Sequence, residues 1–131
     1  AMQAHGLDSG RLIAAGPPPI SMREGASAMA MLLTRFPDTQ AVICVSDLSA
    51  FGALTECQRR AIQVPDQIEL AGFGDYDIAA VAVPTISTIN PFPREIGRRA
   101  AALIVAVLDN VQIGPARVEI EPMLLIRESS R

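Results

Sequence analysis

Three short apolar runs of this chain each end in polar residues that could contact a small molecule. Parallel sheets place the carboxyl ends of neighbouring strands at one edge, and ligands bind in the crevice beyond that edge. The pattern therefore predicts a small-molecule site lined by the residues that follow the runs. The runs and the residues after them are 41–45 with Ser46 and Asp47, 68–72 with Gly74 and Asp75, and 86–89 with Asn90.

Catalytic chemistry is not predicted from these residues. Asp47, Asp75 and Asp77 could together bind Mg²⁺, which prefers oxygen ligands, but helix capping and turn stabilisation account for them more simply. The only histidine is His5, near the start of the chain, so no Ser-His-Asp or Cys-His arrangement is available at the strand ends. No cysteine spacing typical of a metal site is present, and we expect no enzyme activity, no metal and no cofactor.

The turn after the second run contains two glycines in the order Gly72-Phe73-Gly74. A dinucleotide-binding fingerprint would need a third glycine at the position of Asp77 and a helix that opens directly after it. The two glycines are therefore interpreted as a tight turn in which the backbone lies close to a ligand.

The segments between the apolar runs carry helical patterns. Residues 24–36 place apolar residues at i, i+3, i+4 and i+7, the spacing of an amphipathic helix. The run at 41–45 has no polar alternation, which predicts that both of its faces are covered. Strands that alternate with helices predict an α/β fold with a parallel sheet and flanking helices. Further helices are expected over 48–61, over 77–83 as a short element, and after Asn90 up to residue 108, with a buried stripe of Ile96, Ala100, Leu103, Ile104 and Val107.

The two ends of the chain are less regular. Residues 1–6 are interpreted as the last turn of a helix that ends at its glycine, and residues 12–15 as a short strand. The sequence GPPP at 16–19 is a rigid breaker. Two short strands separated by a proline are expected at 118–120 and 123–126.

The composition limits the partners that this segment can contact. The sequence has 131 residues, of which 50% are hydrophobic, and this suffices for one compact domain with a core. Its net charge is −3, and its 11 basic residues are all arginines that form no basic stripe, so this segment is a poor candidate for contacting nucleic acid itself. The absence of a membrane-spanning run and of a visible signal peptide predicts a cytoplasmic protein in which Cys44 and Cys57 are reduced.

Two of the predicted helices carry more apolar residues than one buried face needs. Core packing is the default interpretation, and the interface of a symmetric dimer is the alternative. The surplus residues are Phe51, Leu54 and Thr55 on the first helix, and Ile78, Val81 and Val83 on the second.

A series of short motifs follows one order along the chain. The motifs are Ser46-Asp47, Ala50-Phe51-Gly52, Val64-Pro65-Asp66, Gly72-Phe73-Gly74-Asp75, Pro84-Thr85-Ile86-Ser87-Thr88-Ile89, Ile96-Gly97 followed by Ala100, and Ile126-Arg127-Glu128-Ser129. In this combination the chain resembles the regulatory domain of the lactose-repressor/galactose-repressor (LacI/GalR) family of transcription factors. The resemblance covers residues 20–129, and the stretch at 56–79 is most similar to the gluconate-type repressors of that family.

The resemblance implies a periplasmic-binding-protein-like fold of two α/β lobes that hold an effector between them. Residues 1–19 would be a remnant of the N-terminal lobe and a crossing segment, and residues 20–131 would form the C-terminal lobe. The resemblance further implies a homodimeric repressor that senses a sugar or sugar acid and binds operator DNA. The DNA would be read by a helix-turn-helix upstream of this sequence. No membrane partner is implied.

The resemblance also implies which residues contact the effector and the partner subunit. Effector contacts are implied for Ile20, Ser46, Gly74, and the segment of Asn90, Phe92 and Pro93, with Arg94 beside it. Asp47 and Asp75 match acidic family positions, for which a structural role is the alternative. The dimer surface is implied to include Phe51, Leu54, Thr55, Gln58, Ile78, Val81 and Ala82.

Departures from the family pattern favour a sugar acid as the effector. Gly74 stands where family members often have an aspartate that accepts sugar hydroxyls, and Ile20 and Pro93 replace residues that often stack on a sugar ring. The absence of a carboxylate at Gly74 suits an anion such as a gluconate derivative. Arg23 or Arg94 could bind its carboxylate, and both could instead be solvated helix residues.

Two other functions remain open at this point. A sugar-binding protein of a transport system could have the same fold, and it would be monomeric and carry an export signal. A doubly wound, metal-dependent enzyme would use the three aspartates. Binding of magnesium together with turnover of a phosphorylated substrate would support the enzyme.

Overall fold

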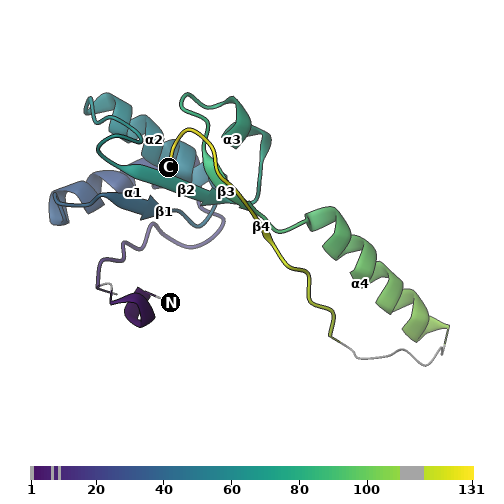
Figure 1. The fold of residues 1–131 in the computed structure, drawn as a ribbon. Coiled ribbons are helices and arrows are strands. Elements are labelled where there is room, and N and C mark those ends of the chain that lie inside the picture. The colour runs from purple at the N-terminus through teal and green to yellow at the C-terminus, as the bar shows by residue number, and fades with distance from the viewer. Residues whose placement is uncertain (1, 7, 9, 110–116) are drawn as a thin grey trace.

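The middle of the chain alternates helices and strands as the sequence predicts (Figure 1). The computed structural model describes residues 2–6, 8, 10–109 and 117–131. In chain order the elements are the 3₁₀ helix η1 (Met2–His5), α1 (Met22–Arg35), β1 (Ala41–Ile43), α2 (Asp47–Arg59), β2 (Glu69–Phe73), α3 (Asp77–Val81), β3 (Ser87–Asn90), α4 (Pro93–Leu108) and β4 (Met123–Leu125).

The sheet has the strand order β1-β2-β3-β4, so strands that follow one another in the chain are also neighbours in space. β1, β2 and β3 run parallel, and β4 joins the edge antiparallel to β3. The register pairs Val42 with Leu70 and Gly72 with Thr88. The predicted α/β fold with a parallel sheet is therefore confirmed, and the carboxyl ends of β1, β2 and β3 lie at one edge.

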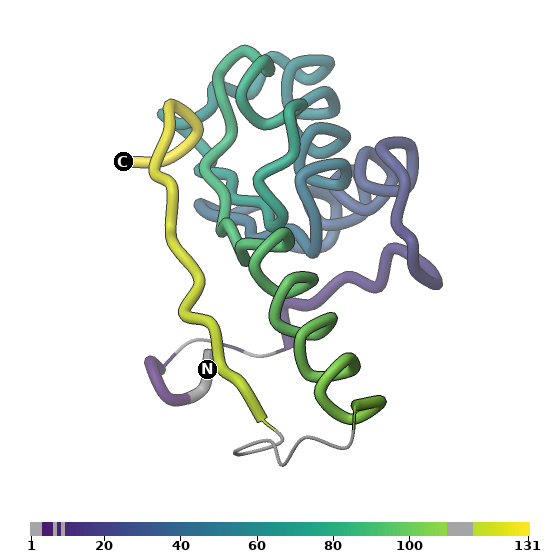
Figure 2. Tube along the Cα trace, turned by 90° about the vertical axis from the view of Figure 1, so that its right-hand side faces the viewer, coloured from purple at the N-terminus to yellow at the C-terminus, as the bar shows by residue number. Residues whose placement is uncertain are grey.

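One face of the sheet is covered by α1 and α2, which lie on the same side of it in Figure 2. The two helices approach so closely that a Cβ atom at Gly52 would overlap the carbonyl oxygen of Met22. Only glycine permits this contact, which seals the core between the helices. The buried apolar residues are Met29, Leu32, Ala50, Ala53, Leu54, Cys57, Ile68, Leu70, Ala79, Ala82 and Ile86.

Both helices begin at serine N-caps near the carboxyl edge of the sheet. Ser21 and Glu24 form a capping box, in which the Ser21 hydroxyl accepts from the Glu24 N–H and the Glu24 carboxylate accepts from the Ser21 N–H. For this reason α1 starts two residues before the predicted boundary. Ser46 and Ser49 form the equivalent pair at the start of α2.

The opposite face of the sheet is open in the described part of the chain. Ile43 is 83% exposed and Val45 is 69% exposed, whereas Val42 and Cys44 pack against the core. Successive side chains of a strand point to opposite faces, so half of this apolar run must lie on the open side. The prediction that both faces of residues 41–45 are covered is therefore wrong for this chain.

The predicted buried stripe of α4 is also wrong. None of the residues of α4 is buried, and Ile104 is 61% exposed. The helix stands away from the sheet in both views (Figures 1 and 2). Its amphipathic pattern predicted a helix correctly but could not indicate which element, if any, covers the apolar face. Over the described residues, the structure contains no helix with both the length and the apolar character that crossing a membrane requires.

The ends of the chain differ from the predictions in part. Residues 12–15 and 118–120 form no strand, while β4 confirms the strand expected at 123–126. The expected helical turn before Gly6 is the 3₁₀ helix η1, and Gly6 follows it with a φ of 70°. His5 is exposed.

The segment that follows β4 fastens the starts of β2 and β3 together. Ser129 is fully buried; its hydroxyl donates to the Leu70 carbonyl oxygen at 2.6 Å and accepts from the Ser87 N–H at 2.8 Å. Its backbone N–H donates to the Thr85 carbonyl, and its carbonyl accepts from the Leu70 N–H. Ser129 thus satisfies backbone groups at the starts of β2 and β3, just before the two strands begin to pair at Ala71 and Ser87.

Both cysteines are free thiols, as the sequence predicts. Burial raises the pKa of Cys44 to about 12 and the pKa of Cys57 to about 11. At neutral pH both are therefore protonated and act as packing residues, because the reactive form of cysteine is the thiolate.

We expect Ser129→Ala to lower the free energy of unfolding by about 2 kcal/mol, because it leaves the Leu70 carbonyl and the Ser87 N–H buried without partners. Chemical denaturation measures the change. Ser27→Ala, on the exposed side of α1, is the control and should change the stability little. Equal effects of the two substitutions would contradict this role of Ser129.

Candidate functional site

The structure brings the predicted polar residues together at the carboxyl edge of the sheet. The Gly74 N–H donates to the Ile89 carbonyl oxygen at 2.9 Å, and the Asn90 side-chain amide donates to the Asp75 carboxylate at 2.9 Å. The Asp47 carboxylate accepts from the Tyr76 N–H, which joins the start of α2 to the same loop. We call this edge, formed by residues 46–47, 74–76 and 88–92, the rim.

Asp47 lies inside the rim and not on its surface. It is fully buried, and its two carboxylate oxygens accept from the Tyr76 N–H at 2.7 Å and from the Thr88 hydroxyl at 2.6 Å. As the structure stands, a ligand cannot reach this carboxylate. The geometry therefore favours a structural role for Asp47 over an effector contact. Its carboxylate holds the loop after β2 and the end of β3 at fixed positions.

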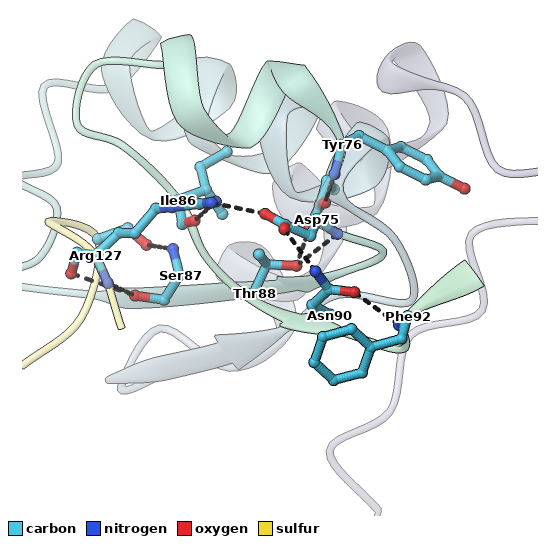
Figure 3. A network of polar contacts seen from close by, with 10 residues as sticks. Asp75, Tyr76, Ile86, Ser87, Thr88, Asn90, Phe92 and Arg127 are labelled. Atoms are coloured by element: carbon cyan, nitrogen blue, oxygen red, sulfur yellow. Dashed lines mark hydrogen bonds and ion pairs between the residues drawn. The ribbon is translucent and has the colours of Figure 1, made fainter. Parts of the chain in front are cut away.

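Asp75 is held from two sides in the network of Figure 3. One carboxylate oxygen accepts from Arg127 Nη2 at 2.6 Å, and the other accepts from the Asn90 amide. The Asn90 carbonyl oxygen in turn accepts from the Phe92 N–H at 2.7 Å. Asp75 and Asn90 are both predicted ligand contacts, and here each uses part of its hydrogen-bonding capacity on the other. Both residues are only half-buried.

Gly74 provides a close backbone approach at the centre of the rim. Its φ is 124°, a region that residues with a side chain rarely adopt, and a Cβ atom there would lie 2.9 Å from the Tyr76 ring. Gly74 is itself buried, and Tyr76 beside it is exposed. The interpretation of the two glycines as one tight turn is wrong for Gly72, which lies in β2 and pairs with Thr88. A Cβ atom at Gly72 would overlap the Asp47 carboxylate, so glycine is needed there for the close approach of Asp47.

An open, shallow groove of about 650 Å³ lies at the amino ends of α1 and α2. Leu48 and Arg23 are among the residues that line it, and Arg23 is exposed. The Ser21 backbone and hydroxyl lower the pKa of Glu24 and hold its carboxylate in the helix cap. The residues that line the groove are Ser21, Met22, Arg23, Glu24 and Leu48.

The remaining predicted contacts are accessible to different extents. Ile20, Ser46 and Phe92 are half-buried, and Pro93 and Arg94 are exposed. The Ser46 hydroxyl already caps α2, so a ligand would share it with the Ser49 N–H. None of these placements tests ligand binding directly, and the set remains a prediction.

A metal site built from aspartates is not formed. Asp47 and Asp75 use their oxygens within the protein, and Asp77 is exposed at the start of α3. Across the described residues there is no group of three histidine, cysteine or acidic side chains that could hold a metal ion.

The predicted dimer surface divides into buried and accessible residues. Leu54 is 1% exposed and Ala82 is 4% exposed, so both belong to the core and the prediction is corrected for them. Val81 is 70% exposed, and Gln58 is exposed with its amide donating to the Val83 carbonyl. The half-buried members are Phe51, Thr55 and Ile78.

Sequence reasoning missed two parts of the site. The groove-lining residues Ser21 and Glu24 carry the S-x-x-E spacing of a capping box, a local signal that could have placed the start of α1 at Met22. The ion pair of Arg127 with Asp75 joins residues 52 positions apart, and no local spacing indicates it.

Comparison with known proteins identifies the family. Residues 1–130 match the model of the periplasmic binding protein-like domain. The chain belongs to this family. Its relatives are transcription regulators of the LacI type, so the family predicted from the motifs is confirmed.

Three of these relatives show how far the similarity extends. The HTH-type transcriptional regulator GntR of Pseudomonas aeruginosa is 36% identical over 115 residues, 87% of this chain and 33% of that protein. A LacI family transcriptional regulator from Silicibacter pomeroyi has a TM-score of 0.87 and 36% identity, covering 100% of this chain and 47% of the other. A complex of the regulator CelR with cellobiose has a TM-score of 0.89 and 31% identity, covering 98% and 39%.

The LacI-type domain therefore spans about a third of the length of this curated relative and less than half of these solved chains. The similarity supports an effector-binding domain at the level of the family. The effector, the DNA and the oligomeric state belong to the whole protein.

We expect Gly74→Ala to lower the free energy of unfolding by about 2 kcal/mol, because alanine disfavours the φ of this position and its Cβ would meet the Tyr76 ring. Gly97→Ala is the matched control, since a Cβ there meets no atom and alanine favours the helix by about 0.5 to 1 kcal/mol. Thermal and chemical denaturation measure both variants. A Gly74→Ala variant as stable as Gly97→Ala would show that the rim is not fixed at this position.

Proposed function

We propose that this LacI-type domain is the effector-binding part of a DNA-binding transcription regulator that senses a small carbohydrate or a sugar acid, such as a gluconate derivative. The observation that carries the proposal is the rim. The rim joins the start of α2, the loop after β2 and the end of β3 at one edge of the sheet. Leu48, two residues after Ser46, lines the groove at the start of α1 and α2. Relatives that are transcription regulators favour this function over a transport binding protein or a metal-dependent enzyme.

The sugar-acid class is supported by the charges around the rim. No carboxylate stands at Gly74, and the carboxylate of Asp47 is buried in its own hydrogen bonds. The amino ends of α1 and α2 lie at the groove, where helix dipoles favour an anion. The exposed Arg23 and Arg94 make no ion pair among the described residues and can contact a carboxylate bidentately. The negative charge of Glu24 disfavours an anion, but its carboxylate is engaged in hydrogen bonds with the Ser21 N–H and hydroxyl in the cap of α1.

The division of the chain and the activity of the whole protein are part of the same proposal. Residues 1–19 are a remnant of the N-terminal lobe and a crossing segment, and residues 20–131 form mainly the C-terminal lobe, with α4 as the portion that lies off the sheet. A helix-turn-helix upstream reads operator DNA in the cytoplasm. The effector binds one arrangement of the lobes better than the other and thereby changes DNA affinity, without a cofactor and without catalysis.

The experiment that tests the effector class is a thermal-shift titration of the intact protein with D-gluconate and with D-glucose. D-Gluconate at about 100 times its dissociation constant should stabilise the protein by about 2.7 kcal/mol and raise its melting temperature. D-Glucose, which lacks the carboxylate, should have a smaller effect. Arg94→Gln and Arg23→Gln should weaken binding of D-gluconate more than binding of a neutral sugar. A melting temperature that rises with neutral hexoses and not with D-gluconate would overturn the sugar-acid assignment.

The homodimer is proposed to form through the exposed side of α2 and α3. Phe51, Thr55, Gln58, Ile78 and Val81 are the accessible members of this surface. Apolar residues at its centre would be covered by the same residues of the partner in a symmetric interface.

We expect Val81→Asp to raise the dimer dissociation constant by a factor of about ten or more, because it would bury a charge in the interface. Sedimentation equilibrium of the intact protein measures the change. Leu12→Asp places the same charge on a residue of similar exposure outside this surface, and it should leave the dimer unchanged. If both variants dissociate alike, or neither does, the interface lies elsewhere.

A further inference from the structure

The loop after β2 places the ring of Tyr76 against Gly74. Three ring carbons lie close to the position that a Cβ atom of Gly74 would take, with Cε1 at 2.9 Å and both Cδ1 and Cζ at 3.2 Å. The Tyr76 ring therefore fills the space that a side chain at position 74 would enter. In Figure 3 the Tyr76 side chain leads away from the hydrogen-bond network of the rim, with its hydroxyl group at the far end.

The backbone of this loop turns sharply between the glycine and the tyrosine. Gly74 has a φ of 124°, and Asp75, the residue between the two, has a φ of 53°. Positive φ angles are typical of tight turns and are rarely adopted by residues with a side chain. The position of the Tyr76 ring over Gly74 is therefore built into the conformation of the loop.

Hydrogen bonds hold the backbone of this loop before and after the turn. The Gly74 N–H donates to the Ile89 carbonyl oxygen at 2.9 Å, and the Tyr76 carbonyl accepts from the Ala79 N–H at 2.9 Å. The Tyr76 N–H donates at 2.7 Å to the carboxylate of Asp47, which is fully buried. A side chain on backbone that is already held in this way loses little conformational freedom when a ligand binds.

Resting on the proposed function, we propose that Tyr76 is a specificity-determining residue of the effector site. Its ring contacts the carbon–hydrogen face of the effector, and its hydroxyl forms a hydrogen bond with an effector hydroxyl. The resemblance implies an effector contact at position 74, and the Tyr76 ring fills the space that a side chain there would enter. Tyr76 thereby supplies the aromatic surface that Ile20 and Pro93 do not.

The chemistry of the ring favours one part of a sugar acid over the other. The face of an aromatic ring carries a partial negative charge, so it attracts carbon–hydrogen groups and disfavours a carboxylate. The guanidinium groups of Arg23 and Arg94 have the opposite preference. A sugar acid would therefore bind with its carbon–hydrogen groups on Tyr76 and its carboxylate toward an arginine.

A neighbouring aromatic residue, Phe73, offers a matched control. Phe73 is 43% exposed and Tyr76 is 50% exposed. A Cβ atom at Gly72 would meet Asp47, so Gly72 faces α2. Successive side chains of a strand point to opposite faces, so Phe73 faces the other side of the sheet. Its substitution removes an aromatic ring of similar exposure outside the rim.

The test measures the affinity of the intact protein for D-gluconate by calorimetry. Tyr76→Ala should raise the dissociation constant about tenfold or more, because it removes the contact surface of the ring. Tyr76→Phe keeps the ring and should raise the constant about threefold, because one hydrogen bond is lost. Phe73→Ala should leave the constant unchanged. Should Tyr76→Ala fail to fold, Tyr76→Leu, which keeps apolar volume without the flat ring, decides by the same measurement.

Several results would overturn the role of Tyr76. One is equal affinity for D-gluconate in the unchanged protein and in Tyr76→Ala, whether or not that variant dissociates into monomers. Another is an equal loss of affinity in Tyr76→Ala and Phe73→Ala, which would indicate a general effect of removing an aromatic ring. If the unchanged protein binds D-glucose and not D-gluconate, the sugar-acid class is wrong, and the same variants titrated with D-glucose decide the role of Tyr76. Binding of neither sugar would overturn both.

A second measurement observes the ring directly. Tyr76 is the only tyrosine of this sequence. In fluorine NMR of the intact protein labelled with fluorotyrosine, the signal that is missing from Tyr76→Phe belongs to Tyr76. This signal should shift when D-gluconate binds, and it should shift without any sugar in Gly74→Ala, whose Cβ displaces the ring. Gly97→Ala, where a Cβ meets no atom, should leave it in place. A Tyr76 signal that does not move when D-gluconate binds would contradict the contact.

Discussion

The buried carboxylate of Asp47 is the interaction on which the rim depends. It lies where α2 begins, and it is bonded to the loop after β2 and to β3. An uncompensated buried charge is costly, so its two donors, the Tyr76 N–H and the Thr88 hydroxyl, must stay in place. Three elements that are separate in the sequence are thereby fixed relative to one another at the edge where a ligand would bind.

This constraint explains how the rim can hold strained backbone. Thr88 donates to Asp47 and also lies 3.4 Å from the Asp75 N–H, so the left-handed Asp75 follows directly on the buried cluster. Arg127 then closes the network from the far end of the chain. A ligand site needs its contact residues held rigidly if ligand binding is to change the arrangement of whole lobes.

The sequence predicted the sheet well because its signals are local. Apolar runs and the helical spacing between them place the middle elements within one or two residues, and the residues after the runs predicted the rim. It failed where the answer depends on distant parts. The apolar faces of β1 and α4 predicted burial, but periodicity states only that a face is apolar, not what lies against it. Similarly, Asp47 appears in the sequence as a possible ligand contact, and only its distance to Thr88 and Tyr76 shows that it is internal.

The position of Ser129 has a consequence for the synthesis of the protein. Its hydroxyl and backbone join the beginnings of β2 and β3, strands whose own residues are made about 40 to 60 positions earlier. These bonds cannot form until residue 129 has left the ribosome. Until then the starts of β2 and β3 lack these partners, so this part of the sheet is completed by a residue that is made after both strands.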